Sequence, residues 1–170
     1  MWRSPKWWPF GVRCVFTGVS EDQTMFLGSV ESSLDAKRRV QVPSSWRNAC
    51  GSPKFALVKW QPDPSEKPCI LGMMPSLLFD FVKKMNDKPF SDPKAERVRR
   101  SLSREAALLE LDSAGRLTLP VNLMNATGLA PKSKIMVVGM FDRFQIWNLD
   151  DYLGVSEEDD KAYPDAIKEF

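Results

Sequence analysis

The chain has 170 residues, 27% of them charged and 43% hydrophobic, which is typical of a globular protein long enough to bury a core. It contains no histidine, and this excludes histidine-based acid–base catalysis, Ser-His-Asp and Cys-His sites, and zinc sites with histidine ligands. The three cysteines, Cys14, Cys50 and Cys69, form no Cys-x-x-Cys pair and indicate buried reduced thiols. We therefore expect no cofactor and no metal.

Charge is unevenly distributed along the chain. Residues 25–149 carry 19 Lys and Arg against 12 Asp and Glu, whereas residues 150–170 carry 8 acidic residues and 2 lysines. A basic body favours an anionic partner such as nucleic acid, although a solvated surface with a solubilising acidic tail needs no partner. Composition leaves both interpretations open.

Residues 1–24 differ from the rest of the chain. Their apolar stretch is interrupted by Pro9 and Arg13, and it is too short and broken for a signal peptide or a membrane span. We therefore expect no membrane association.

An internal repeat organises the chain from residue 33 onward. Residues 33–51, SLDAKRRVQVPSSWRNACG, return 77 positions later as residues 110–128, ELDSAGRLTLPVNLMNATG. Seven identities at one spacing, without a gap, predict a fold that uses one unit twice. The identical pairs are Leu34 and Leu111, Asp35 and Asp112, Arg39 and Arg116, Pro43 and Pro120, Asn48 and Asn125, Ala49 and Ala126, and Gly51 and Gly128.

Each copy predicts a tight turn, a strand and a short helix. Residues 39–42 and 116–119 alternate polar and apolar side chains, which is the period of a half-buried strand. Pro43 and Pro120 end these strands and suit the first turn of a helix that stops at the glycine closing each copy. Ahead of each strand, Asp-x-x-x-Arg places an aspartate that can accept backbone N–H bonds and an arginine that can point outward.

The remaining elements complete two similar units with helices between them. Residues 76–86 carry an apolar stripe of helical spacing, and a second helix begins at the capping sequence Ser91-Asp92-Pro93. Residues 151–170 are acidic and low in apolar content, which predicts a mobile tail. The other predicted strands are residues 26–34, 54–60, 69–74, 108–112, 135–139 and 144–147.

The second helix between the units carries a basic face that could touch phosphates. Such a face is more often plain solvated surface, and we favour that interpretation. Its cations are Lys94, Arg97, Arg99, Arg100 and Arg104.

The repeat resembles a known family. D-A-K-R-R followed by V-x-V-P, and D-x-x-G-R followed by L-x-L-P, are similar to the paired signatures of the MraZ family, bacterial transcriptional regulators with two tandem SpoVT/AbrB-like units. Residues 25–29 resemble the family's N-terminus and residues 138–147 its last two strands. In the first copy Arg38 stands where the family usually has glycine, whereas the second copy keeps Gly115.

The resemblance implies an α+β fold, mainly β, in which two tandem ββαββ units exchange hairpins within one chain to form an AbrB-like barrel. The units would be residues 25–75 and 106–150, with a helical linker at 76–105 and an acidic tail at 151–170. Because Met25 lies where the family begins, we expect residues 1–24 to be an extension from an upstream start codon. A functional extension is the alternative.

The resemblance also implies a sequence-specific DNA-binding regulator, cytoplasmic and associated with the nucleoid. Family members assemble into ring-shaped homo-oligomers and engage direct repeats in double-stranded promoter DNA. Their target is the promoter of the division and cell-wall gene cluster, which usually includes their own gene.

The two Asp-x-x-x-Arg turns are the candidate DNA-binding face. Arginine can bind guanine O6 and N7 with two hydrogen bonds, and lysine is a compact phosphate partner. The residues alone equally allow local ion pairs between aspartate and arginine at the end of a sheet. The expected contacts are Lys37, Arg38, Arg39 and Arg116, with Arg47 a weaker candidate, while Asp35, Asp112 and Gly115 shape the turns.

If the family glycine adopts a positive φ angle, Arg38 in its place costs on the order of 1 kcal/mol or more.

An alternative function is an oligomeric protein-interaction or antitoxin-like module of the same fold with only non-specific DNA binding. We do not expect an enzyme, since there is no histidine, no phosphate-binding glycine loop and no evident pair of carboxylates.

Overall fold

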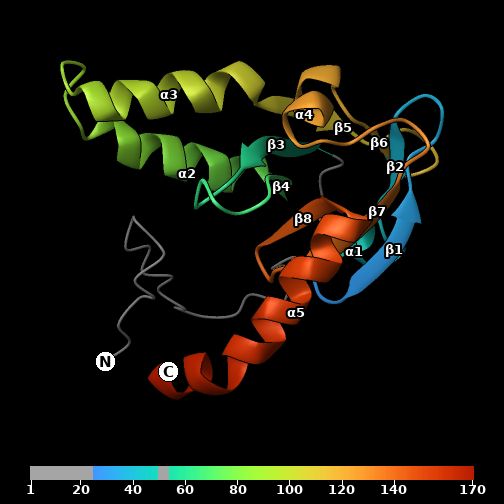
Figure 1. Ribbon diagram of the computed structural model, residues 1–170. Coiled ribbons are helices and arrows are strands. Elements are labelled where there is room, and N and C mark those ends of the chain that lie inside the picture. Colours follow the sequence, from blue (N-terminus) through green and yellow to red (C-terminus); the bar gives the residue numbers. More distant parts are fainter. Residues whose placement is uncertain (1–24, 50–53) are drawn as a thin grey trace.

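The computed structural model contains antiparallel β-strands and α-helices (Figure 1). The structure describes residues 25–49 and 54–170, so the interpretation of residues 1–24 and of Cys14 and Cys50 lies outside the described residues. The elements are β1 (Ser29–Ser33), β2 (Arg39–Gln41), α1 (Ser44–Ala49), β3 (Lys54–Trp60), β4 (Cys69–Met73), α2 (Pro75–Asn86), α3 (Pro93–Glu105), β5 (Ala107–Glu110), β6 (Arg116–Thr118), α4 (Val121–Ala126), β7 (Lys134–Gly139), β8 (Arg143–Asn148), α5 (Leu149–Ala166) and η1 (Ile167–Glu169).

Strands from the two copies of the unit are interleaved in one sheet. One sheet has the order β1-β7-β8-β4-β3-β5, and β2 pairs with β6 in a separate two-stranded sheet. Thus β1 of the first copy pairs with β7 of the second, and β5 of the second pairs with β3 of the first. The predicted mixed class, mostly β, is confirmed. The predicted closed barrel is not found among the described strands, because the short strands β2 and β6 pair only with each other and leave β1 and β5 as open edges.

The core between these sheets is built by both copies and centres on four aromatic rings. Phe26, Trp46, Phe55 and Phe144 are each at most 1% exposed. Trp46 meets the Phe26 ring edge-on at 5.4 Å, and Phe55 meets Phe144 edge-on at 5.5 Å. Such edge-to-face pairs add roughly 0.5–1.5 kcal/mol beyond area burial. Apolar pairs of the repeat surround them, namely Val40 and Leu117, Val42 and Leu119, and Trp46 and Leu123.

Helices α2 and α3 form a hairpin that covers a second, smaller apolar cluster of Ala56, Val58, Leu71 and Met73. The far end of this helical hairpin lies on the opposite side of the molecule from β2 and β6 (Figure 1). As the sequence predicts, Asp92 caps α3, since its side chain accepts hydrogen bonds from the N–H groups of Lys94 and Ala95. Cys69 is buried and unpaired, as expected, and burial raises the pKa of its thiol.

The C-terminal segment, for which the sequence predicted a mobile tail and no helix, is helical. Helix α5 begins at Leu149 and is capped by Asn148, whose side-chain oxygen accepts a 2.9 Å hydrogen bond from the N–H of Asp150. Asp150 and Asp151 lie in its first turn, where the helix dipole favours negative charge. The prediction gave weight to low apolar content and missed this cap. None of the helices in the described part of the chain is long and apolar enough to cross a membrane.

Candidate nucleic-acid interface

The first candidate turn is held together by the carboxylate of Asp35. Its Oδ1 accepts hydrogen bonds from the backbone N–H groups of Lys37 (2.8 Å) and Arg39 (2.9 Å). Its Oδ2 accepts a 2.6 Å hydrogen bond from Nε of Arg39. A backbone hydrogen bond also closes the turn, since the N–H of Arg38 donates to the carbonyl of Asp35. The aspartate therefore fixes both the turn and the direction of the arginine side chain.

The second turn repeats this arrangement. Asp112 Oδ1 accepts from the N–H groups of Ala114 (2.9 Å) and Arg116 (3.0 Å), and Oδ2 accepts from Nε of Arg116 at 2.8 Å. The N–H of Gly115 donates to the carbonyl of Asp112. The two copies of the sequence repeat therefore form turns with the same hydrogen bonds. The local ion pairs that sequence analysis held as the alternative are present in both copies.

Both turn carboxylates are held in the charged form. The Arg39 backbone N–H, together with the Arg39 guanidinium and the Lys37 N–H, keeps the pKa of Asp35 below its ordinary 3.8, although partial desolvation opposes this. The corresponding groups of Arg116 and Ala114 lower the pKa of Asp112 in the same way. Each charged carboxylate in turn fixes the guanidinium beside it.

The two turns differ at one position, the residue before the arginine. Gly115 has φ of +75° and Arg38 has φ of +65°. The expectation that the family glycine adopts a positive φ angle is therefore confirmed, and Arg38 occupies a backbone region that L-residues disfavour. The first turn keeps its shape despite this cost, so its extra arginine is presented on the same backbone as the glycine of the second turn.

The antiparallel pairing of β2 with β6 places the two turns at opposite ends of a ladder only three residues long. Arg39 lies opposite Thr118, and Gln41 lies opposite Arg116. Arg39 Nη1 lies 3.9 Å from the carboxylate of Asp112, the aspartate of the other turn. We call residues 35–39 and 112–116 together the paired turns (Figure 1, where β2 and β6 lie at the right).

Each copy also supports the turn of the other. The Val42 N–H donates to the carbonyl of Gly115 at 3.1 Å, and the Leu119 N–H donates to the carbonyl of Arg38 at 2.9 Å. Gln41 Nε2 adds hydrogen bonds to the carbonyls of Ala114 (3.0 Å) and Gly115 (3.1 Å). The sequence alone does not mark Gln41 as part of the site. Its only signal is its polar position in the alternating strand, which does not disclose a partner 73 residues away.

The predicted cations meet at the paired turns, but with different surroundings. Arg39 and Arg116 are half-buried, with side chains 26% and 32% exposed, and each is bound to its aspartate. Lys37 is exposed, whereas Arg38 is half-buried and directs Nε toward the Leu119 carbonyl at 3.4 Å. Arg47, on α1, lies across Gly115 of the second turn.

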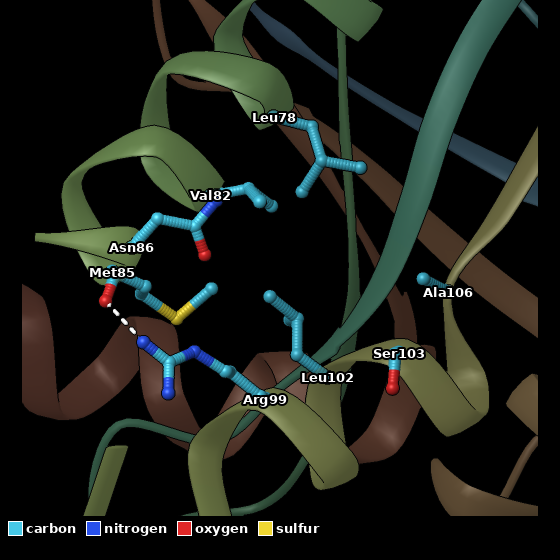
Figure 2. A pocket seen from close by; sticks show the side chains of 8 residues that line it. All are labelled: Leu78, Val82, Met85, Asn86, Arg99, Leu102, Ser103 and Ala106. Carbon is cyan, nitrogen blue, oxygen red and sulfur yellow. Dashed lines mark hydrogen bonds between the residues drawn. The ribbon is translucent and has the colours of Figure 1, made fainter. Parts of the chain in front are cut away.

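The basic face of α3 belongs to the helical hairpin. Arg99 is bound to Glu96 (2.6 Å) and to the carbonyl of Met85 (2.6 Å), and its guanidinium lies 5.3 Å from the Phe90 ring centre. Figure 2 shows Arg99 directed into the space between α2 and α3, beside Met85. This cation therefore stabilises the hairpin, and the solvated-surface interpretation is wrong for it. The interpretation is confirmed for the other cations of that face, which are exposed, namely Lys94, Arg97, Arg100 and Arg104. Among the described residues, no three potential metal-ligating side chains gather in one place.

Comparisons with known proteins give consistent matches. Residues 102–167 match the family model described as "MraZ protein, putative antitoxin-like". The chain is 37% identical over 125 residues to the transcriptional regulator MraZ of Caulobacter vibrioides, covering 73% of this chain and 77% of that protein. It is 30% identical over 152 residues to the transcriptional regulator MraZ of Alcanivorax borkumensis, covering 86% and 99%. A third relative of the same name, from Leuconostoc citreum, is 28% identical over 145 residues.

Proposed function

Because this chain belongs to the MraZ family, we propose that it is a sequence-specific transcriptional regulator that binds double-stranded DNA through the paired turns. Its relatives carry the name transcriptional regulator, which supports a role in transcription rather than enzymatic catalysis. The observation that carries the proposal is the pairing of β2 with β6, since it presents two arginines of the same geometry on one face.

The chemistry of the paired turns suits DNA. An arginine held through Nε can direct Nη groups at a guanine edge or a phosphate. In Arg39 this applies first to Nη2, because Nη1 lies 3.9 Å from the carboxylate of Asp112. Phosphate contacts fix the position of a protein on the duplex, and contacts with base edges supply sequence preference. The proposed contacts are Lys37, Arg38, Arg39, Arg116 and, with a smaller share, Arg47, while Asp35, Asp112 and Gly115 shape the turns.

The wider assembly is part of the same proposal. The pairings of β1 with β7 and of β5 with β3 support a fold of two tandem AbrB-like units that exchange hairpins within one chain. Ring-shaped homo-oligomers would place many paired turns on direct repeats, and binding at several repeats multiplies affinity through effective concentration. We infer a cytoplasmic, nucleoid-associated regulator of the division and cell-wall promoter, including that of its own gene.

The test is fluorescence anisotropy of the full chain on DNA from upstream of its own gene, with a scrambled duplex as control and a salt series for each. We expect preferential binding that weakens steeply with salt, with a log–log slope of about −0.9 for each phosphate neutralised. The Arg39→Ala/Arg116→Ala variant should lose this preference. The matched control is Lys94→Ala/Arg97→Ala, which removes two exposed cations from α3 and should bind as the wild type does.

A second candidate function rests on the words "antitoxin-like" in the description of the matching family model. In that case the chain would act mainly through contacts with another protein, and its DNA binding would be non-specific. Equal and weak binding to both duplexes, unchanged in Arg39→Ala/Arg116→Ala, would favour this second function. Loss of preferential binding in that variant, with the oligomer intact by light scattering, would exclude it.

A further inference from the structure

Arg47 has an unusual place for a positively charged side chain. It extends from α1 of the first copy onto the second turn, so a Cβ at Gly115 would lie only 2.5 Å from Cδ and 2.6 Å from Cζ of Arg47. Gly115 is buried beneath this side chain. Any larger residue at position 115 would displace the guanidinium, so the glycine provides the surface on which Arg47 lies.

The guanidinium of Arg47 has no carboxylate to neutralise it in residues 25–49 and 54–170, and its Nε is buried without a hydrogen-bond partner. A partly buried charge without a partner is unfavourable unless an anion approaches it. This distinguishes Arg47 from Arg39 and Arg116, whose Nε atoms are each bound to an aspartate.

The repeat gives this arrangement a counterpart in the first turn. At the 77-residue spacing, Gly115 corresponds to Arg38 and Arg47 corresponds to Met124. In the first turn the arginine is therefore part of the turn and an apolar residue, Met124, lies buried in the neighbouring helix α4. In the second turn the arginine comes from helix α1 and the turn has glycine.

The two turns are bound to the other copy by equivalent backbone hydrogen bonds. The carbonyl of Arg38 accepts from the N–H of Leu119, just ahead of α4, and the carbonyl of Gly115 accepts from the N–H of Val42, just ahead of α1. Each turn thus lies beside the start of a helix from the other copy. Each turn also has one arginine that joins the two copies. Arg38 reaches the carbonyl of Leu119, and Arg47 lies on Gly115, so the two arginines come from non-equivalent sequence positions.

We propose that Arg47, lying on Gly115, is the phosphate-binding group of the second turn and the counterpart of Arg38 in the first. This assignment rests on the proposed function, DNA binding, and adds that the two halves of the face hold the duplex backbone through different elements. A guanidinium without a carboxylate partner suits a phosphate oxygen, which accepts charge-assisted hydrogen bonds from it. Arg39 and Arg116, fixed by their aspartates, then serve the base edges between the two phosphate contacts.

The repeat itself supplies the test variants. Arg47→Met introduces the residue that the second copy has at the corresponding position, so it keeps the apolar length and removes the charge. We expect weaker binding to the upstream and the scrambled duplex by a similar factor, and a salt slope reduced by about 0.9. Adding Gly115→Arg to Arg47→Met gives the second turn the arrangement of the first, with arginine in the turn and methionine in the helix. This double variant should recover the salt slope of the wild type.

Thermal unfolding and light scattering of each variant establish that the fold and the oligomer are intact, and Arg38→Gly provides the matched loss in the first turn. An Arg47→Met protein that folds and binds with the wild-type affinity and slope would overturn the assignment and leave Arg47 a packing residue. Failure of the proposed function is a separate result. If the wild type binds both duplexes equally, the regulator proposal fails, yet the slope of Arg47→Met on the scrambled duplex still decides the phosphate assignment. No binding by the wild type to either duplex overturns both.

Discussion

The two repeated units and the helical hairpin between them are packed in different ways. The units share a core in which four aromatic rings are at most 1% exposed, and both copies of the repeat contribute to it. In the hairpin, α3 has no buried residue and α2 has only Met85, and an apolar groove of about 270 Å³ stays open between the helices (Figure 2). The paired turns therefore stand on the tightly packed region. We expect changes in that region to cost far more than equivalent changes in the hairpin.

The largest effect is expected for Trp46→Ala. It removes the ring that contacts Phe26 and Phe144 and the hydrogen bond from its indole N–H to the Leu27 carbonyl. We expect a loss of about 3–5 kcal/mol in the free energy of unfolding, because a large buried ring leaves a cavity. Urea denaturation followed by tryptophan fluorescence and circular dichroism measures it. The control Phe79→Ala, at a ring 66% exposed on α2, should change stability by less than about 0.5 kcal/mol.

A smaller effect is expected for Leu102→Ala in the helical hairpin. Leu102 is half-buried and lines the open groove, so its removal exposes little new surface and leaves no closed cavity. We expect a loss of roughly 1 kcal/mol, well below that of a fully buried leucine. The same urea titration measures it. A loss equal to that of Trp46→Ala would contradict the difference between the two regions and make the hairpin an equal part of the core.

Sequence reasoning succeeded where the pattern is local and repeated. The Asp-x-x-x-Arg turns, the strands that follow them and the cap at Asp92 depend on residues within a few positions of one another, and the structure has each of them. The positive φ angle of Arg38 was also accessible, because Gly115 marks the same place in the other copy.

Contacts between distant segments were not accessible in this way. The hydrogen bonds of Gln41 and the position of Arg47 on Gly115 both join residues of different copies, and neither leaves a local pattern. Whether the sheet closes depends likewise on which strands pair, and periodicity does not report partners. Helix α5 was missed for another reason. Its stability comes from the Asn148 cap and a favourable first turn rather than from an apolar stripe.

The tightly packed region nevertheless contains unfavourable backbone positions, since Arg38, Lys132 and Phe141 all have positive φ angles, and Arg38 is the one that lies in the paired turns. Replacing it by glycine removes a side chain from a residue with φ of +65°. We expect Arg38→Gly to raise the stability by about 1 kcal/mol while weakening DNA binding modestly, because a cation is lost. Thermal unfolding and anisotropy on the same preparation measure the two effects. A lower melting temperature would refute the strain argument, and would indicate instead that contacts of the Arg38 side chain outweigh the backbone cost.

The smallest effect concerns pH and separates the two regions by their carboxylates. Asp35 and Asp112 in the turns, and Asp92 at the start of α3, all have a pKa lowered below 3.8, in each case first by a backbone hydrogen bond. A carboxyl whose pKa is lower in the folded state stabilises the fold fully above its unfolded pKa. This stabilisation is lost as the pH falls through the lower, folded value.

Thermal unfolding from about pH 6 to about pH 3 should therefore show a declining melting temperature in the wild type. Asp35→Asn/Asp112→Asn keeps the side-chain oxygen that accepts the backbone hydrogen bonds but removes the charge, so its decline should be shallower. Asp92→Asn is the matched variant in the hairpin. It should leave the decline of the melting temperature almost unchanged, because the cooperative transition reports the core beneath the paired turns and Asp92 lies outside that core. Equal flattening by the two sets of variants would mean that the hairpin and the repeated units unfold as one, and the difference in packing between them would have no consequence for stability.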